Sequence, residues 1–430
     1  MKGRMLLILI CVSMLLLTSS IYAQQKEVKL TFWTFVEKHA DYMQLAVEEF
    51  NKANPDVKLV LEASTYPYEE MHDKLLMALT SGVGAPDLAD IEISKFGLFL
   101  RGDIQLHDIT DLVDEYRDKL IEARLQPYNY MGKQYGIDYH LGALVAYYNL
   151  DLFKAAGINV DDIVMWEDYV EAGKKITQPD KDIWMATVET SDLWSIHPLM
   201  EQRGGGGYNA AGEMILDCQE NIEALQFMQD MVYKYNIARV APGSYYHDPS
   251  YYAFVNEGHV ASMMMPQWYM IRFTEFMPDL SGKIAIRPMP KATPDGKRSG
   301  MGGGTGTVIT KQIDPAKLDI AKKYLGFAKL TYEANKRIWT DLGFDPTRKD
   351  VYDDPDLMKP LPYFNNEPVL AVIKELFENN DIKPEALGPY YPEIRELLRE
   401  TVCYRAIEEK ADPATILKEA ADEIRALAGK

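Results

Sequence analysis

The stretch VKLTFWTF, residues 28–35, opens the run of elements that decides the fold. β-forming residues dominate it, and its apolar and polar residues partly alternate, which predicts a strand. Helical and strand patterns then alternate, with apolar residues at helical spacing over 41–53 and 68–79 and strand patterns over 57–62 and 86–93. A strand–helix–strand–helix–strand order predicts a mostly parallel sheet covered by helices.

The same alternation continues toward the C-terminus. The chain has 430 residues, and a domain holds about 150, so two or three domains are expected. The sequence therefore predicts an α/β protein that is too long for one open sheet. Strand patterns cover 144–148, 184–188, 260–265 and 284–290, and helical patterns cover 151–156, 166–176, 222–234, 316–331 and 413–427.

The first 23 residues have the order of a secretory signal peptide. Lys2 and Arg4 give a positive start, the run MLLILICVSMLLL at 5–17 is nearly all apolar, and Ala23 is a small residue at the end. The alternative is a membrane anchor, but a spanning helix needs about 20 apolar residues. Cys11 is not expected to be a lipidation site, because no small residue precedes it. We expect cleavage after Ala23 and export to the periplasm, or to the cell surface of a single-membrane bacterium.

The chain is strongly acidic. Lys and Arg total 46 and Asp and Glu total 65, which gives a formal charge of −19, and removing Lys2 and Arg4 with the signal leaves −21. This balance disfavours roles that need a broad cationic face, such as coating nucleic acid or an anionic membrane. Three Cys are too few for a disulfide scaffold. Cys218 and Cys403 remain after the signal, and their spacing leaves open whether they pair or stay free.

Two glycine-rich stretches do not fit a phosphate-binding loop. Residues 204–207 are followed by neither Lys-Ser/Thr nor a helix start, so we expect a surface turn there. Residues 301–306 match neither the Walker A nor the dinucleotide-binding spacing. Their glycines predict instead a close approach of the backbone to a ligand.

The sequence carries no recognisable catalytic motif. Its seven His residues are scattered without a paired metal-binding spacing, and no Gly-x-Ser-x-Gly is present. We therefore expect a protein that is not an enzyme and holds neither metal nor cofactor. Paired carboxylates for glycosidic cleavage stay open, because 65 acidic residues always contain such pairs. A secreted glycoside hydrolase is the competing hypothesis.

Nine segments together resemble the extracellular solute-binding proteins of bacterial ABC importers, in the carbohydrate class that includes maltose-binding proteins. The segments occur in the family's order over nearly all of the chain after the signal. The most specific is YYNLDLFKAAG at 147–157. The others are 31–34 (TFWT), 50–57 (FNKANPDV), 75–90 (LLMALTSGVGAPDLAD), 132–138 (GKQYGID), 166–169 (WEDY), 254–268 (FVNEGHVASMMMPQW), 302–306 (GGGTG) and 346–351 (PTRKDV).

The resemblance implies a type II periplasmic-binding-protein fold, in which two α/β lobes flank a cleft and crossing strands join them. Each lobe is expected to hold a mostly parallel sheet flanked by helices. Crossings are expected near residues 137–138, 286–288 and 343–344. The N-terminal lobe would then comprise 24–138 and 288–343, and the C-terminal lobe 139–287 and 344–430.

Ligands in such clefts lie outside the carboxyl ends of the strands, and sugars need aromatic platforms and several hydrogen-bonding side chains. Trp33 ends the first strand, Glu37 and Lys38 follow it, and Glu92 and Ser94 lie where the third strand ends. We predict that Trp33, Glu37 and Glu92 contact ligand.

The resemblance adds further candidates. Trp268 matches the family's stacking tryptophan, and Arg348 lies in Thr-Arg-Lys where the family usually has Ala-Arg-Lys. At the first crossing, Asp138 and His140 replace the family's frequent Pro and carboxylate, which leaves open which of the two contacts ligand. Backbone contacts are expected from Gly303 and Gly304. Second-rank aromatic candidates are Trp194, Tyr246, Tyr390 and Tyr391.

The sequence thus predicts a monomeric binding protein for a sugar or short oligosaccharide. Ligand would stabilise a hinge-closed form that docks on an ABC permease, whose ATPase is a further implied partner. The family's habits favour plant-derived pentose or hexose oligosaccharides. A polyamine stays the closer alternative because Glu37, Glu92 and Asp138 are acidic, whereas Lys38 and Arg348 are too few cations for a phosphate ligand.

Overall fold

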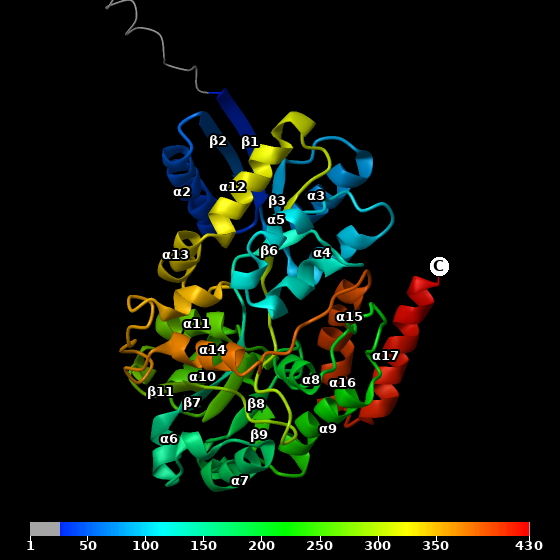
Figure 1. Cartoon of the computed structure of the whole chain (residues 1–430). Helices are drawn as coiled ribbons and strands as arrows, with labels where there is room; N and C mark the ends of the chain where they lie inside the picture. Colours follow the sequence, from blue (N-terminus) through cyan, green and yellow to red (C-terminus); the bar gives the residue numbers. More distant parts are fainter. Residues whose placement is uncertain (1–25, 430) are drawn as a thin grey trace, which may run out of the picture.

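A computed structural model describes residues 26–429 of the chain (Figure 1). The predicted signal segment, 1–23, lies outside the described residues. None of the helices formed by residues 26–429 combines the length and the apolar character needed to traverse a lipid bilayer. Two groups of elements, one above the other in Figure 1, are each built around a sheet. We call the group around the first sheet the first lobe and the other the second lobe.

The first sheet has five strands in the order β2-β1-β3-β12-β6. β1 runs parallel to β2 and β3, whereas β12 runs antiparallel to β3 and β6. The predicted mostly parallel sheet and its strands at 28–35, 57–62 and 86–93 are therefore confirmed. β12 was not among the predicted strands, because its glycine-rich sequence lacks a clear strand pattern. The strands are β1 (Lys26–Thr34), β2 (Val57–Thr65), β3 (Leu88–Glu92), β6 (Gly136–Asp138) and β12 (Thr305–Ile309).

Helices cover this sheet and bury one core with it. The side chains of Phe32 on β1, Phe50 on α2 and Leu325 on α12 are fully buried. α2 ends where predicted, and α3 ends at Gly82, whose left-handed φ of 79° glycine adopts without strain. The helices are α2 (Glu37–Ala53), α3 (Tyr68–Ser81), α4 (Ile93–Phe96), α5 (Thr110–Asp114), α12 (Leu318–Leu330) and α13 (Tyr332–Leu342).

The second lobe corrects one expectation about its sheet. Its three strands lie in the order β10-β7-β11, and β7 (Leu144–Asn149) runs antiparallel to both β10 (Ser262–Pro266) and β11 (Ile284–Arg287). A mostly parallel sheet was expected here. The reason for the difference is that β7 carries the chain away from the first crossing, whereas β10 and β11 bring it back. A parallel pair, β8 (Ala186–Val188) and β9 (Ala238–Val240), lies beside this sheet.

The second lobe holds most of the remaining helices. Those predicted at 151–156, 166–176, 222–234 and 413–427 are confirmed within a few residues at each end. Cys218 and Cys403 are free thiols in the described part of the chain, and Cys403 is buried. The helices are α6 (Leu150–Ala155), α7 (Trp166–Ile176), α8 (His197–Arg203), α9 (Gln219–Tyr233), α10 (Pro249–Asn256), α11 (Met270–Phe276), α14 (Val369–Glu378), α15 (Tyr391–Leu397), α16 (Cys403–Ile407) and α17 (Pro413–Ala428).

Three connections run between the lobes, through 139–143, 288–304 and the chain after α13. The second connection hydrogen-bonds to the second lobe, since Leu144 N donates to Gly300 O and Trp166 N donates to Lys291 O, both at 3.1 Å. We therefore propose that the chain enters the first lobe near Gly304, later than the boundary expected at 288. The boundaries near 138 and 343 stay as proposed.

Candidate functional site

Strand ends from the first sheet meet the glycine-rich loop at one edge. Glu92 ends β3, and Asp138 ends β6; β12 begins between them, so that Thr305 pairs with Glu92 and Gly306 pairs with Asp138. The loop is tied to the end of β3 because Ile93 N donates to Gly304 O at 3.0 Å. The placement of Glu92, Asp138 and the glycine loop at the carboxyl ends of β3 and β6 follows from the sheet alone.

Asp138 is the centre of a buried charge cluster. Its carboxylate forms an ion pair with Arg124, and both side chains are 1% exposed. It also accepts from His140 N at 3.2 Å and Thr305 N at 3.3 Å. Burial acts to raise the pKa of Asp138, but Arg124 and, with smaller effects, His140 and Lys329 together outweigh it, and the pKa is lowered. Asp138 is therefore an anion that holds the crossing together.

The position of the Arg124 side chain accounts for the glycines at residues 303 and 304 of the loop. Its Nη2 donates to Gly303 O at 2.8 Å. Gly304 has a φ of 134°, and a Cβ added there would lie 1.6 Å from Arg124 Nη2. Gly303 has a φ of 70°. A residue with a side chain would be strained at either position, and at Gly304 it would also collide with the guanidinium.

Trp268 lies over the other side of this loop. It belongs to a short 3₁₀ turn directly after β10, and its Nε1 donates to Gly302 O at 3.0 Å. Trp194 packs edge-on against it with ring centroids 5.4 Å apart. The ring is half-buried. Trp268 is thus fixed in orientation by a hydrogen bond and a ring contact, which suits an aromatic platform.

His140 is buried at the first crossing. Its ring centroid lies 4.5 Å from that of Phe344, and its Nδ1 lies 3.5 Å from Asp345 Oδ1. That nitrogen has no hydrogen-bond partner among residues 26–429. The Asp345 carboxylate accepts from the backbone nitrogens of Gly142 and Ala143, each at 2.9 Å. The first and third connections are therefore joined at this point.

A pocket of about 440 Å³ opens between the lobes on the other side of Glu92. We call it the interlobe pocket. Tyr68, Glu92 and Lys95 line it from the first lobe, and Asp192 and Arg395 line it from the second. These side chains give both lobes hydrogen-bond donors and acceptors that face one space.

The Glu92 carboxylate is held in place from the first lobe. It accepts from Tyr68 Oη at 3.0 Å, from Ser94 N at 2.8 Å and from the Ser94 hydroxyl. Burial first, and the Glu92 charge second, raise the pKa of Tyr68, so this phenol stays protonated and donates. Burial also raises the pKa of Asp192 across the pocket. Glu92 can still accept further hydrogen bonds from a bound molecule.

Three predicted residues lie apart from this group. Trp33 packs against the Tyr66 ring at 5.4 Å, with Lys74 Nζ 5.0 Å from its own ring centroid. Glu37 is exposed in the first turn of α2. Arg348 pairs with Asp350 at 2.6 Å and donates to Leu330 O at 2.9 Å. Their contact with a ligand stays a prediction.

Sequence reasoning missed Tyr68, Arg124, Asp192 and Arg395. Tyr68 could have been found, because it begins the helix that follows β2 and so lies at the same edge of the sheet as Glu92. Arg124 lies in a segment without periodic pattern, 14 residues before its partner. Asp192 and Arg395 reach the pocket from the second lobe, and no local pattern reports a contact between lobes.

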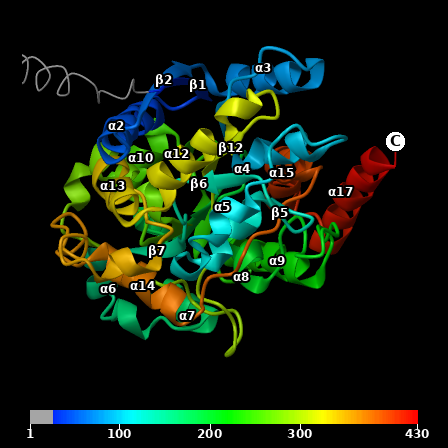
Figure 2. The ribbon, with the colours of Figure 1, turned by 45° about the horizontal axis from the view of Figure 1, so that its top comes forward.

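The lobes also touch beside the interlobe pocket, where α4 and α15 lie side by side (Figures 1 and 2). A Cβ at Gly97 would lie 2.4 Å from Gly388 O, so the backbones are in close contact. Arg101 Nη2 donates to both carboxylate oxygens of Glu393 at 2.6 Å, and its Nε donates to Pro389 O at 2.9 Å. We call this contact the lobe latch.

Comparison with known proteins agrees with this geometry. The family described as bacterial extracellular solute-binding protein matches residues 36–331. An arabinooligosaccharide-binding protein of Halalkalibacterium halodurans is 41% identical over 401 residues, which cover 93% of this chain and 89% of the relative. One of Bacillus subtilis is 40% identical over 405 residues, which cover 93% and 92%.

Solved structures show the same fold. A maltose-bound MalE3 of T. maritima is 22% identical with a TM-score of 0.69, and the match covers 93% of this chain and 99% of that one. The sugar-binding protein MalE of Xanthomonas citri is 16% identical with a TM-score of 0.74, and the match covers 92% and 96%. Both likenesses concern the two-lobed fold, which is thereby confirmed.

Proposed function

Because the chain belongs to the family of bacterial extracellular solute-binding proteins, we propose that it binds a short arabinose-containing oligosaccharide between its two lobes. The name shared by the two relatives at 40% and 41% identity supports this ligand class. It also agrees with the pentose or hexose oligosaccharide expected from the resemblance.

The interlobe pocket is the observation that carries the proposal. A sugar hydroxyl both donates and accepts, so it needs acceptors and donors in one place. The first lobe offers the Glu92 carboxylate as an acceptor, and the second offers the Arg395 guanidinium as a donor. A ligand that contacts both would stabilise the closed arrangement of the lobes by its differential affinity for it.

We propose Glu92 as the principal sugar contact in the interlobe pocket. Trp268, Gly303 and Gly304 do not line this pocket and are proposed as contacts at the neighbouring glycine-rich loop. Asp138 is proposed to act indirectly, since its oxygens are taken by Arg124 and by backbone nitrogens. Four further ligand contacts remain proposed, and they would form or break as the lobes close or open. They are His140, Trp33, Glu37 and Arg348.

We further propose that the chain is exported after cleavage at Ala23, acts as a monomer and delivers the sugar to an ABC permease. The relatives are named as binding proteins, so we propose delivery without turnover. A glycoside hydrolase would instead release product from an aryl arabinoside or from the oligosaccharide itself.

Thermal unfolding of the chain from residue 24 tests the ligand class. Arabinotriose at a hundredfold excess over its dissociation constant is expected to add about 2.7 kcal/mol to the free energy of unfolding. Maltotriose and spermidine serve as comparisons under the same conditions. A shift with spermidine but with none of the arabino-oligosaccharides would contradict the proposal, and release of arabinose during the assay would favour the hydrolase.

The lobe latch gives a second prediction. Arg101→Gln removes a contact made only while the lobes touch, and exposed ion pairs contribute about 0.2–1 kcal/mol, so arabinotriose affinity is expected to fall about 1.4–5-fold. Isothermal titration calorimetry measures the affinity. Arg117→Gln is the matched control, because Arg117 and Arg101 are equally exposed at 35% and the ion pairs of Arg117 among residues 26–429, with Asp114 and Glu122, lie within the first lobe. Equal effects of the two variants would contradict a role in closure.

A further inference from the structure

Three metal-ligating side chains meet in the second lobe, outside the interlobe pocket. His197 and Glu201 lie four residues apart on α8 and so share one face of the helix. Glu385 comes from the segment between α14 and α15, beside α8 (Figures 1 and 2). One possible ligand atom of each lies within 4.8 Å of the others, and the residues are 6%, 2% and 2% exposed. We call these residues the His–Glu–Glu cluster.

The carboxylates of the cluster have unused acceptor capacity. Glu385 Oε1 accepts from the Tyr391 hydroxyl, but Oε2 is buried and has no hydrogen-bond partner within residues 26–429. No side-chain hydrogen bond is made by Glu201 to any other described residue. A buried acceptor that stays unpaired costs about 1–3 kcal/mol, and more when it is charged, so a native structure normally provides a partner for it.

One hydrogen bond fixes the tautomer of the His197 imidazole. Its Nε2 lies 2.9 Å from Met301 O, and a carbonyl only accepts, so Nε2 carries the hydrogen and Nδ1 keeps its lone pair. Metal-bound histidines typically donate their other ring N–H to a carbonyl or carboxylate in this way. Burial, with Arg395 as a smaller cause, lowers the pKa of His197 to about 4, so the ring is neutral at pH 7.

The electrostatics of the cluster favour a compact cation. Burial, and then the charge of the other carboxylate, raise the pKa of Glu201 well above its ordinary value, and burial raises that of Glu385 to about 7. Lys383 faces Glu201, while Arg124 and Arg395 face Glu385 from a distance. Neither carboxylate receives a hydrogen bond from these cations in the described chain. The two carboxylates and the imidazole each offer a ligand atom within 4.8 Å of the others, which is a geometry that one compact cation could bridge.

We propose that His197, Glu201 and Glu385 form a binding site for Zn²⁺, with water in the fourth position. One imidazole and two carboxylates are a ligand set that Zn²⁺ accepts, at about 2.0–2.2 Å from each donor. Ca²⁺ takes six to eight oxygens, and Mg²⁺ keeps an octahedral shell of waters, so three donors of mixed type suit them poorly. None of the three residues lines the interlobe pocket. The cluster does border the proposed sugar site, since His197 contacts Met301 in the glycine-rich loop and packs on Trp194.

Zinc titration of the metal-free chain from residue 24 tests this site. Isothermal titration calorimetry at pH 7.5 is expected to show one Zn²⁺ per chain, with affinity at least 100-fold lower in the Glu201→Gln/Glu385→Gln double variant. The glutamines keep the shape and remove like charges, so the variant is expected to fold. Its circular dichroism spectrum and melting curve check this. The matched control is Glu257→Gln/His259→Ala, which removes a His–Glu pair with a 3.5 Å contact, half-buried at the His and exposed at the Glu, and should leave zinc affinity unchanged.

Three outcomes would overturn the proposal. The first is the absence of saturable zinc uptake by the unaltered chain, which would leave a carboxyl pair that shares protons. The second is unchanged affinity in the double variant, which would place any zinc elsewhere. The third is a rise in melting temperature with Ca²⁺ or Mg²⁺ as large as with Zn²⁺, since the site would then not be one for a transition metal.

Discussion

Asp138→Asn is expected to lower the free energy of unfolding by about 3–5 kcal/mol, because it leaves the Arg124 guanidinium buried without its counter-charge. The environment offers little relief, since Nε and Nη1 of Arg124 already lack partners among residues 26–429. Urea unfolding of the ligand-free chain at pH 7, followed by tryptophan fluorescence, measures the change. A loss below about 1 kcal/mol would contradict the role given to this ion pair.

A double variant separates the charge from the packing. Arg124→Met/Asp138→Leu removes both charges, so it is expected to lose less stability than Asp138→Asn alone. Acid supplies a further check with a defined sign. The folded pKa of Asp138 is lowered, so its contribution is present above the unfolded value of about 3.9 and is lost as the pH falls through the folded pKa. The stability gap between the unaltered chain and Asp138→Asn should therefore close in acid.

Trp268→Ala is expected to weaken arabinotriose binding about 10- to 100-fold, or by about 1.4–2.7 kcal/mol, while the unfolding of the ligand-free protein changes much less. The variant would remove the proposed contact with the sugar. Within the protein the half-buried ring makes one hydrogen bond, to Gly302, and ring contacts with Trp194, His247 and Tyr269 at centroid distances of 5.4–6.1 Å. Isothermal titration calorimetry measures the affinity, and urea unfolding measures the stability.

Trp184 provides the matched control for this variant. It is also half-buried in the second lobe, and its Nε1 donates to Asp182 Oδ1 at 2.7 Å. Because Trp184 lies where β8 begins, away from the glycine loop, Trp184→Ala should leave the affinity unchanged. If Trp268→Ala unfolds the protein instead, Trp268 is a core residue and the proposed stacking role is wrong.

The predictable part of this structure is the part that local pattern encodes. Residues 28–93 carry clear helical and strand periodicities, so their order fixes most of the first sheet and places Glu92 at its edge. β12 was not predicted because glycines precede and interrupt its strand pattern. Gly304 leaves room for the Arg124 guanidinium, and Gly306 leaves room for the Tyr128 ring. The direction of β10 and β11 was not predicted either, because the periodicity of apolar residues shows which residues are buried and not which way a strand runs.

The residues of the candidate site also differ in whether local pattern predicts them. Glu92, Asp138 and the glycine loop follow from strand ends within one lobe. Asp192, Arg395 and the His–Glu–Glu cluster depend on contacts between segments far apart in the chain, and a single sequence holds no record of such contacts. Trp268 was found only through the resemblance, since its 3₁₀ turn has no distinctive pattern.

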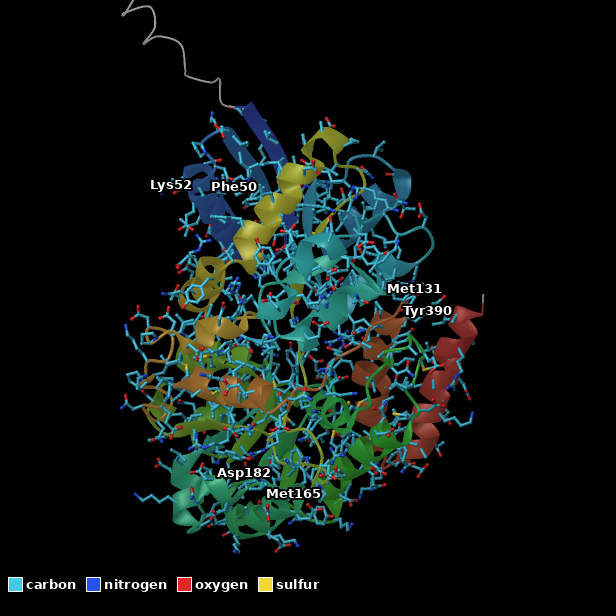
Figure 3. All side chains as sticks on the ribbon, in the orientation of Figure 1. Phe50, Lys52, Met131, Met165, Asp182 and Tyr390 are labelled. Carbon is cyan, nitrogen blue, oxygen red and sulfur yellow. The ribbon has the colours of Figure 1, made fainter. Side chains whose placement is uncertain are left out.

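The low reactivity of the two free thiols makes the protein suitable for dye labelling at one introduced cysteine. Burial raises the pKa of Cys218 to about 11 and that of Cys403 further, so little reactive thiolate forms near neutral pH. A cysteine introduced at Met131, which is 84% exposed in the first lobe, would therefore react first. Met131 in the first lobe and Tyr390, which precedes α15 in the second lobe, are both labelled in Figure 3. If the lobes close on sugar as proposed, a fluorophore at the introduced cysteine would report sugar as a change in light emission, and the chain would serve as a scaffold for an oligosaccharide sensor.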